Sequence, residues 1–132
     1  MSVTTIAILI FVVLIVIVLR SANKTGQKAA ADIRVIVQLK QAGSKLDKPH
    51  EIDFFLYFLN ETAATVAAQE LQGKGFSTSV QPSAHNGSEW LLQAKRSMLP
   101  TAEALVQIRK ELEALAFAGQ GKYDGWGAGV VR

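Results

Sequence analysis

EIDFFLYF, residues 51–58, is the stretch that decides the fold of this chain. Its even-numbered positions are all large and apolar, whereas the odd-numbered positions between them hold Asp53, Phe55 and Tyr57. Successive side chains of a β-strand point to opposite faces, so a period of two is typical of a strand with one face on a core. We predict a strand here, buried on the face formed by Ile52, Phe54, Leu56 and Phe58.

The flanking segments alternate between helical and extended patterns. Asn60 is a favourable N-cap for the alanine-rich run after it, and Gly43 is placed to end an earlier helix. In the last helix an apolar stripe recurs at helical spacing, and we expect Arg109 and its charged neighbours on the solvent side. The predicted elements are helices over 29–42, 61–72 and 101–118, strands around 76–80 and 89–95, and a last strand ending near Val131.

From residue 51 onward these elements follow the order β-α-β-β-α-β. This order is that of a split-βαβ unit with right-handed crossovers, which places both of its helices on one face of the sheet. The predicted fold class is therefore mixed α/β, more specifically α+β: a ferredoxin-like sandwich, preceded by a single transmembrane helix. The helix over 29–42 either covers the second sheet face or leaves it open.

The amino-terminal segment, residues 3–19, is apolar apart from two threonines. As a helix it spans about 26 Å of a bilayer core roughly 30 Å thick, so we predict a transmembrane helix rather than a cleaved signal peptide or a core element. A juxtamembrane linker over 20–30 and a domain over 31–132 follow. Arg20, Lys24 and Lys28 should lie at the membrane surface, which places the amino terminus outside and the domain in the cytoplasm.

Composition limits the chemistry that the domain can perform. The chain has no cysteine, so disulfides, thiolate catalysis and cysteine zinc sites are excluded. The net charge of +3 equals the three cations of the linker, which leaves a neutral domain. His50 stands beside Glu51 and Asp53, but neighbouring strand residues face opposite ways, and we expect His50 on the surface. No nucleophile, base and orienting group occur together, so we predict no enzyme, no cofactor and no metal site.

The carboxy-terminal run GKYDGWG, residues 121–127, is the most specific motif. Glycine is favoured where the backbone needs positive φ or close approach, so the run predicts a shaped turn into the last strand. Together with LKQAGSKLDKPHEIDFFLYF (39–58), Gly75-Phe76 and Leu115-Ala116, it resembles the regulator of ribonuclease E activity B (RraB) family over residues 33–131. The resemblance implies a ferredoxin-like fold and a bacterial, non-enzymatic regulator that binds ribonuclease E or its degradosome and lowers or redirects ribonuclease E activity in RNA degradation.

The candidate protein-binding residues are aromatic or adjoin aromatic residues. Phe55 and Tyr57 should be exposed if the sheet face opposite the helices is open. The residues of the carboxy-terminal run either form a second part of the contact surface or shape a structural turn, in which Asp124 bonds the backbone and Trp126 packs on a helix. The alternative function is RNA binding by the same sheet face, favoured if Lys74, Lys95 and Arg96 converge on it. The full set is Phe55, Tyr57, Tyr123, Asp124 and Trp126.

Overall fold

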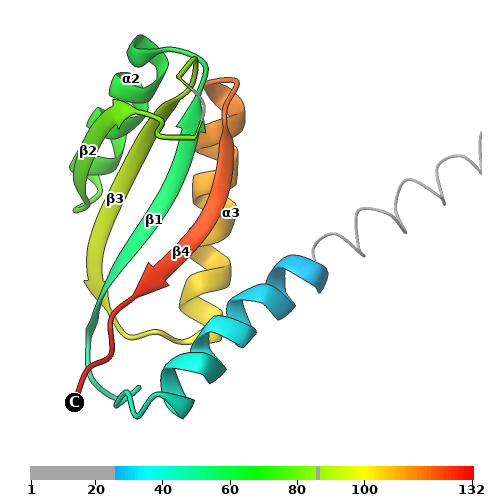
Figure 1. Cartoon of the computed structure of the whole chain (residues 1–132), viewed down its shortest axis with the longest axis vertical. Helices are drawn as coiled ribbons and strands as arrows, with labels where there is room; N and C mark the ends of the chain where they lie inside the picture. Colours follow the sequence, from blue (N-terminus) through cyan, green and yellow to red (C-terminus); the bar gives the residue numbers. More distant parts are fainter. Residues whose placement is uncertain (1–25, 86) are drawn as a thin grey trace, which may run out of the picture.

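The computed structural model describes residues 26–85 and 87–132, which form a four-stranded antiparallel sheet and three helices (Figure 1). We refer to the first helix, residues 26–41, as the amino-terminal helix. It is followed by β1 (His50–Phe58), α2 (Glu61–Gly73), β2 (Ser77–Pro82), β3 (Trp90–Met98), α3 (Ala102–Ala118) and β4 (Lys122–Ala128).

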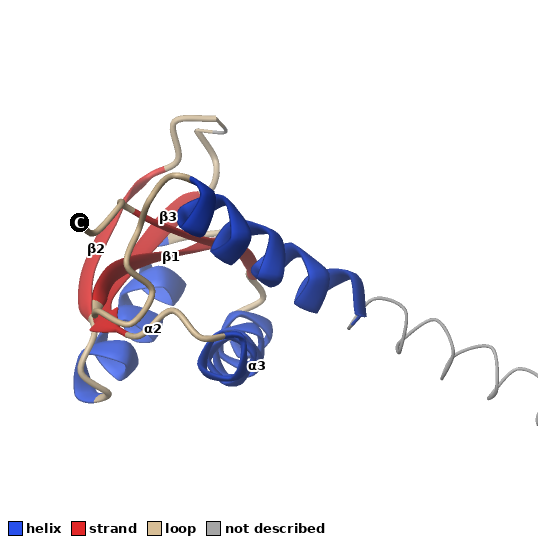
Figure 2. Ribbon diagram, turned by 90° about the horizontal axis from the view of Figure 1, so that it is seen from below, coloured by secondary structure: helices blue, strands red, loops and turns tan. Residues whose placement is uncertain are grey.

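The element order and the α+β arrangement predicted from the sequence are confirmed. The sheet order is β2-β3-β1-β4, so β1 is central and pairs with β3 on one side and β4 on the other. Helices α2 and α3 lie on the same face of the sheet (Figure 2). The core lies between them and the predicted face of β1, whose Ile52, Phe54, Leu56 and Phe58 are buried.

All three helices end in the same backbone motif. After the amino-terminal helix, the amide of Ser44 donates to the carbonyl of Leu39, and that of Gly43 donates to Lys40. Gly43 has a φ of +89°, which glycine adopts at little cost, so the predicted end of this helix is confirmed. The pattern recurs around Gly75 after α2 and around Gln120 after α3. The motif turns the chain sharply into the next segment.

The carboxy-terminal run is a strand, not the turn that the sequence predicts. Residues Lys122–Ala128 pair with β1 along almost their whole length. The register shifts between Phe55 and Leu56, which pair with Gly125 and Tyr123, so Asp124 is the extra residue of a β-bulge. Gly125 meets the bulge geometry with a φ of +121°. The bulge, rather than a turn, explains the glycine at position 125.

A second glycine of the run, Gly121, is required because there is no room for a side chain at its position. A Cβ atom placed there would collide with the carbonyl oxygen of Tyr57 and with the ring of Phe58. The position therefore requires close approach between the end of α3 and the end of β1, as the sequence suggests for one of these glycines.

The amino-terminal predictions are only partly addressed. The predicted transmembrane helix, residues 3–19, lies outside the described residues, as do Arg20 and Lys24. Within the ranges 26–85 and 87–132, none of the helices combines the length and the hydrophobicity needed to cross a bilayer. Of the predicted linker over 20–30, residues 26–30 are described, and they form the first part of the amino-terminal helix.

His50 is a buried core residue, which corrects the expectation that it lies on the surface. Its Nδ1 bonds the carbonyl oxygen of Lys48 at 2.8 Å, and its Nε2 bonds the hydroxyl of Ser44. The Ser44 hydroxyl oxygen also accepts from the backbone amide of Val131 at 2.9 Å. Because a carbonyl oxygen can only accept, Nδ1–H of the neutral imidazole donates to Lys48, and Nε2 accepts from the Ser44 hydroxyl. They attach residues 129–132 to the loop that precedes β1.

Replacing Ser44 with alanine should therefore loosen the carboxy-terminal segment. Ser44→Ala leaves both Nε2 of His50 and the Val131 amide without their partner, and we expect a loss of about 1–3 kcal/mol of unfolding free energy. Urea denaturation measures this loss, and amide hydrogen exchange should show faster exchange at Val131. The exposed Ser97→Ala is the matched control, and an equal loss in both variants would contradict the assignment.

Candidate functional site

The sheet face opposite α2 and α3 carries the predicted aromatic pair. Phe55 and Tyr57 alternate with the buried residues of β1 and are half-buried on this open face. No described helix lies across it, because the amino-terminal helix runs along the β4 side of the domain (Figures 1 and 2). The expectation that this face is uncovered is confirmed for the described part of the chain.

Glycines on β4 leave one side of the Phe55 ring open. Phe55 faces Gly125 across the sheet, and Asp53 faces Gly127. A Cβ atom added to either glycine would meet no atom within 4 Å, so both positions border open space. On the other side Phe55 faces Gln93, and Tyr57 faces Leu91. The face therefore has a small apolar centre formed by Phe55, Tyr57 and Leu91.

Charged groups around this centre are paired with one another. Lys95 lies 3.9 Å from the Asp53 carboxylate, which also accepts from Gln93 at 3.0 Å. The ammonium of Lys122 sits 5.6 Å from the centroid of the Tyr57 ring, within cation–π range, and 4.0 Å from Glu89. An apolar centre with a mixed polar rim is the composition of a protein-binding surface.

The three cations proposed to mark an RNA-binding face do not converge on it. Lys95 faces the open side, where it pairs with Asp53. Arg96 instead stacks over Phe76 of the core, at 5.2 Å, and Lys74 caps the end of α2. Phosphate binding depends on clustered, unneutralised cations, so this arrangement does not favour RNA binding.

Two candidate residues of the carboxy-terminal run, Tyr123 and Trp126, lie on the sheet face opposite to Phe55 and Tyr57. Tyr123 and Trp126 pair with the buried Leu56 and Phe54, and both pack against the core on the helix side. Asp124, at the bulge, is exposed and lines a shallow hollow together with Tyr57. The structure therefore does not bring the five predicted residues onto one surface.

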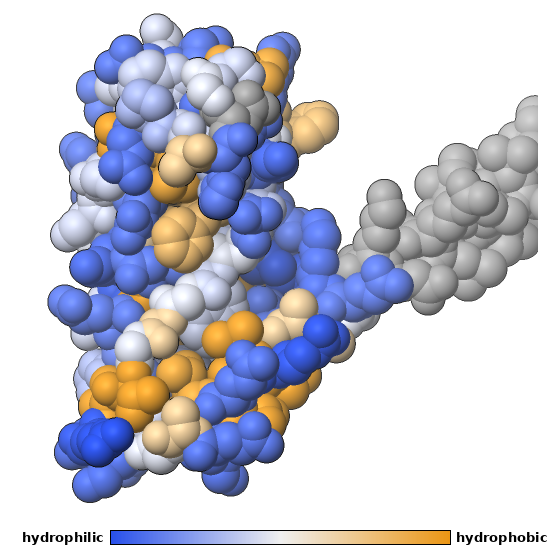
Figure 3. Space-filling model, viewed as in Figure 1, coloured by the Kyte–Doolittle hydropathy of each residue, from blue (hydrophilic) through white to orange (hydrophobic). Residues whose placement is uncertain are grey.

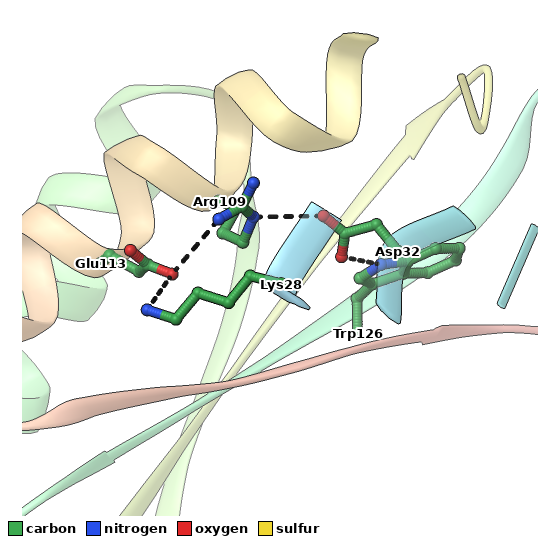
Figure 4. Close-up of polar contacts among 5 residues, drawn as sticks. All are labelled: Lys28, Asp32, Arg109, Glu113 and Trp126. Carbon is green, nitrogen blue, oxygen red and sulfur yellow. Dashed lines mark hydrogen bonds and ion pairs between the residues drawn. The ribbon is translucent and has the colours of Figure 1, made fainter. Parts of the chain in front are cut away.

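Trp126 belongs to a polar cluster that joins three segments (Figure 4). Its indole N–H donates to one carboxylate oxygen of Asp32 in the amino-terminal helix, at 3.0 Å. Nε of Arg109, on α3, donates to the other oxygen at 3.2 Å. Asp32 and Arg109 are 6% and 4% exposed, so this ion pair is buried. We refer to Asp32, Arg109 and Trp126 as the Asp32 cluster.

Arg109 is thus a buried residue, contrary to the expectation that it faces solvent. Its Nη1 lies 3.8 Å from Glu113, one helical turn further along α3, which also pairs with Lys28 at 2.9 Å. Lys28, predicted at the membrane surface, is therefore tied to α3 by its ammonium. Nη2 of Arg109 is buried without a partner among the described residues. The sequence did carry a signal for this burial, because position 109 adjoins Ile108 and Leu112 on the apolar stripe.

The environment of Tyr123 suppresses its ionisation. Burial raises the pKa of Tyr123 well above its usual value of 10.0, and the nearby Asp32 carboxylate adds to the effect. Tyr123 lines a small hollow of about 150 Å³ together with Lys28, Arg109 and Glu113. A neutral phenol in this position packs against the core and serves no acid–base role at physiological pH.

The two histidines of the chain do not form part of a metal-binding group within the described ranges. His50 is used in the structural bonds to Ser44 and Lys48, and His85 lies in the loop between β2 and β3. No group of three or more His, Cys, Asp or Glu residues of residues 26–85 and 87–132 is arranged to hold a metal ion.

Fold and surface together define a small α+β domain whose most prominent candidate site is a contact surface. The family model described as "Regulator of ribonuclease activity B" (RraB) matches residues 29–128. The chain belongs to this family, and the match begins within the amino-terminal helix and ends with β4. No curated protein sequence matches the chain.

Removing the Asp32 carboxylate should destabilise the whole domain. Asp32→Ala leaves the buried Arg109 charge without its closest partner and the Trp126 N–H unbonded, at a cost of about 3 kcal/mol of unfolding free energy. The exposed Asp47→Ala should change stability by less than about 0.5 kcal/mol. Urea denaturation compares the two, and similar values would contradict the role of the Asp32 cluster.

The shifted pKa of Tyr123 predicts a pH dependence. Above pH about 10 the unfolded chain releases the Tyr123 proton while the folded chain retains it, so the unfolding free energy should fall as pH rises. Below that pH Tyr123 is protonated in both states, so its full contribution to the unfolding free energy is present. Tyr123→Phe removes the ionisable group, and its unfolding free energy should decline less steeply with alkaline pH than that of the natural chain. Equal slopes would show that Tyr123 ionises alike in both states.

Proposed function

We propose that this chain is a non-catalytic regulator that binds ribonuclease E and lowers its activity in RNA degradation. Its family membership supports a role in regulating ribonuclease activity. The observation that carries the binding role is the open sheet face, where Phe55, Tyr57 and Leu91 form an apolar centre that no described helix covers. Buried aromatic anchors supply most of the binding energy in many protein interfaces.

Membrane anchoring is the second part of the proposal. The apolar sequence of residues 3–19 and the cations after it favour a single span in a bacterial inner membrane, with the amino terminus outside and the domain in the cytoplasm. An anchored inhibitor meets its partner at the membrane surface, which raises its effective concentration toward any ribonuclease held there.

The glycines of β4 allow a test that leaves the fold intact. Gly127→Lys adds a long side chain at the position that faces Asp53 on the open side, and Gly129→Lys adds the same side chain beyond the end of β4. A Cβ atom at either position meets no atom within 4 Å. With the full chain in detergent, ribonuclease E cleavage of an RNA substrate should be slowed by the natural chain and by Gly129→Lys. We expect Gly127→Lys and Phe55→Ala to require about tenfold more protein for equal inhibition.

Each part of the proposal has its own contradicting result. If the natural chain neither binds nor slows ribonuclease E, the partner is wrong. If Gly127→Lys inhibits as well as Gly129→Lys, the open face is not the contact surface. A shift of single-stranded RNA at physiological salt that is lost in Phe55→Ala would instead favour RNA binding.

A further inference from the structure

The amino-terminal helix has a second, unpartnered face. Its inner side is held by the buried Asp32 and Leu39 and by Ile36, which packs against the core. On the outer side Ile33 and Val37 remain 50% and 44% exposed. The exposed Ala30 lies three positions before Ile33, and Val37 lies four positions after it, so these three residues form a short apolar stripe along the outer side.

Cations border this stripe on both sides. Arg34 and Lys40 lie three residues before and after Val37, which places each about 60° from it around the helix axis. Both side chains are exposed, and neither forms an ion pair with a carboxylate of residues 26–85 or 87–132. Lysine and arginine so placed can keep their charge in water while their stems cover apolar surface.

Charge is also divided between this part of the domain and the rest. Residues 26–49 contain five Lys or Arg and two Asp, a net charge of +3, and one of the two, Asp32, is buried against Arg109. Residues 50–132 contain seven Lys or Arg and nine Asp or Glu, a net charge of −2. The near-neutral total thus conceals a basic end, formed by the amino-terminal helix and the loop after it. Figure 3 shows apolar surface bordered by hydrophilic surface where this helix lies.

We propose that the outer face of the amino-terminal helix lies on an anionic phospholipid surface. A narrow apolar stripe between cations is the composition of a helix that binds in the plane of a membrane interface. Residues 1–25, which directly precede the described part of this helix, contain the apolar residues 3–19. The inference rests on the membrane location proposed above.

A second copy of this chain fits the face less well than a lipid surface does. Packing two such stripes together would bring Arg34 and Lys40 of both copies close to one another without acidic partners. An anionic bilayer instead supplies negative charge beside both cations. Because the Asp32 cluster fixes the inner side of the helix, lipid contact on the outer side would also set the orientation of the open sheet face.

The absence of cysteine makes a site-specific test possible. Gln41 is exposed and lies one turn beyond Val37 on the line of the stripe, so a label there leaves the stripe intact. Gln41→Cys and, on the exposed side of α3, Ala114→Cys each accept one nitrobenzoxadiazole label.

The labelled full chain is placed in vesicles of phosphatidylcholine, with or without phosphatidylglycerol. We expect the label at residue 41 to shift to the blue and brighten only with phosphatidylglycerol, and the label at 114 to stay unchanged. Adding Arg34→Gln and Lys40→Gln should abolish the change, because these two cations hold the helix on the anionic surface.

The outcomes separate this inference from the proposed function. Equal emission at residue 41 in both vesicle types overturns the lipid contact alone. A blue shift that grows with protein concentration in detergent indicates a second copy and also overturns it. If the chain fails to float with vesicles of either composition, the membrane location fails together with this inference. Inhibition of ribonuclease E in detergent should be the same with and without Arg34→Gln and Lys40→Gln.

Discussion

The carboxylate of Asp32 is the group on which the arrangement of the domain depends. It accepts from Arg109 of α3 and from Trp126 of β4, while Asp32 itself belongs to the amino-terminal helix. Without these two hydrogen bonds, the helix would be held to the core mainly by the side chains of Leu39 and the half-buried Ile36. A buried ion pair adds modest net stability, but breaking it is costly, so it favours one docking position over the alternatives. That position leaves the open sheet face free.

The bulge at Asp124 supplies the partner for this carboxylate. In a regular strand, residues 123 and 126 would point to opposite faces because they are three apart. The extra residue brings both Tyr123 and Trp126 to the helix side, where they pair across the strands with the buried Leu56 and Phe54. It also turns Gly125 and Gly127 toward the open face, beside Phe55 and Asp53. The bulge thus places Trp126 beside Asp32 on one sheet face and places glycines beside the candidate contact surface on the other.

Local patterns predicted most of the fold. The alternation in β1, the Asn60 cap and the Gly43 stop each act within a few residues, and each is found as expected. The errors concern side chains whose burial depends on tertiary contacts and a strand irregularity. Arg109 looks like a solvent-facing residue until Asp32, distant in sequence, is brought beside it. His50 is buried with both ring nitrogens bonded to the preceding loop, and Val131 bonds the same Ser44 hydroxyl. A β-bulge also interrupts the period of two by which a strand is predicted. The carboxy-terminal run therefore looks like a turn when only its glycines are considered.

The central claim is that Asp32 docks the amino-terminal helix onto α3 and β4. Backbone amide hydrogen exchange of the full chain in detergent tests it most directly, by comparing natural Asp32 with Asp32→Asn. The account predicts that amides of residues 33–41 lose most of their protection in the variant while those of β1 and β3 exchange slowly in both chains. Equal protection of residues 33–41 in the two chains would contradict it.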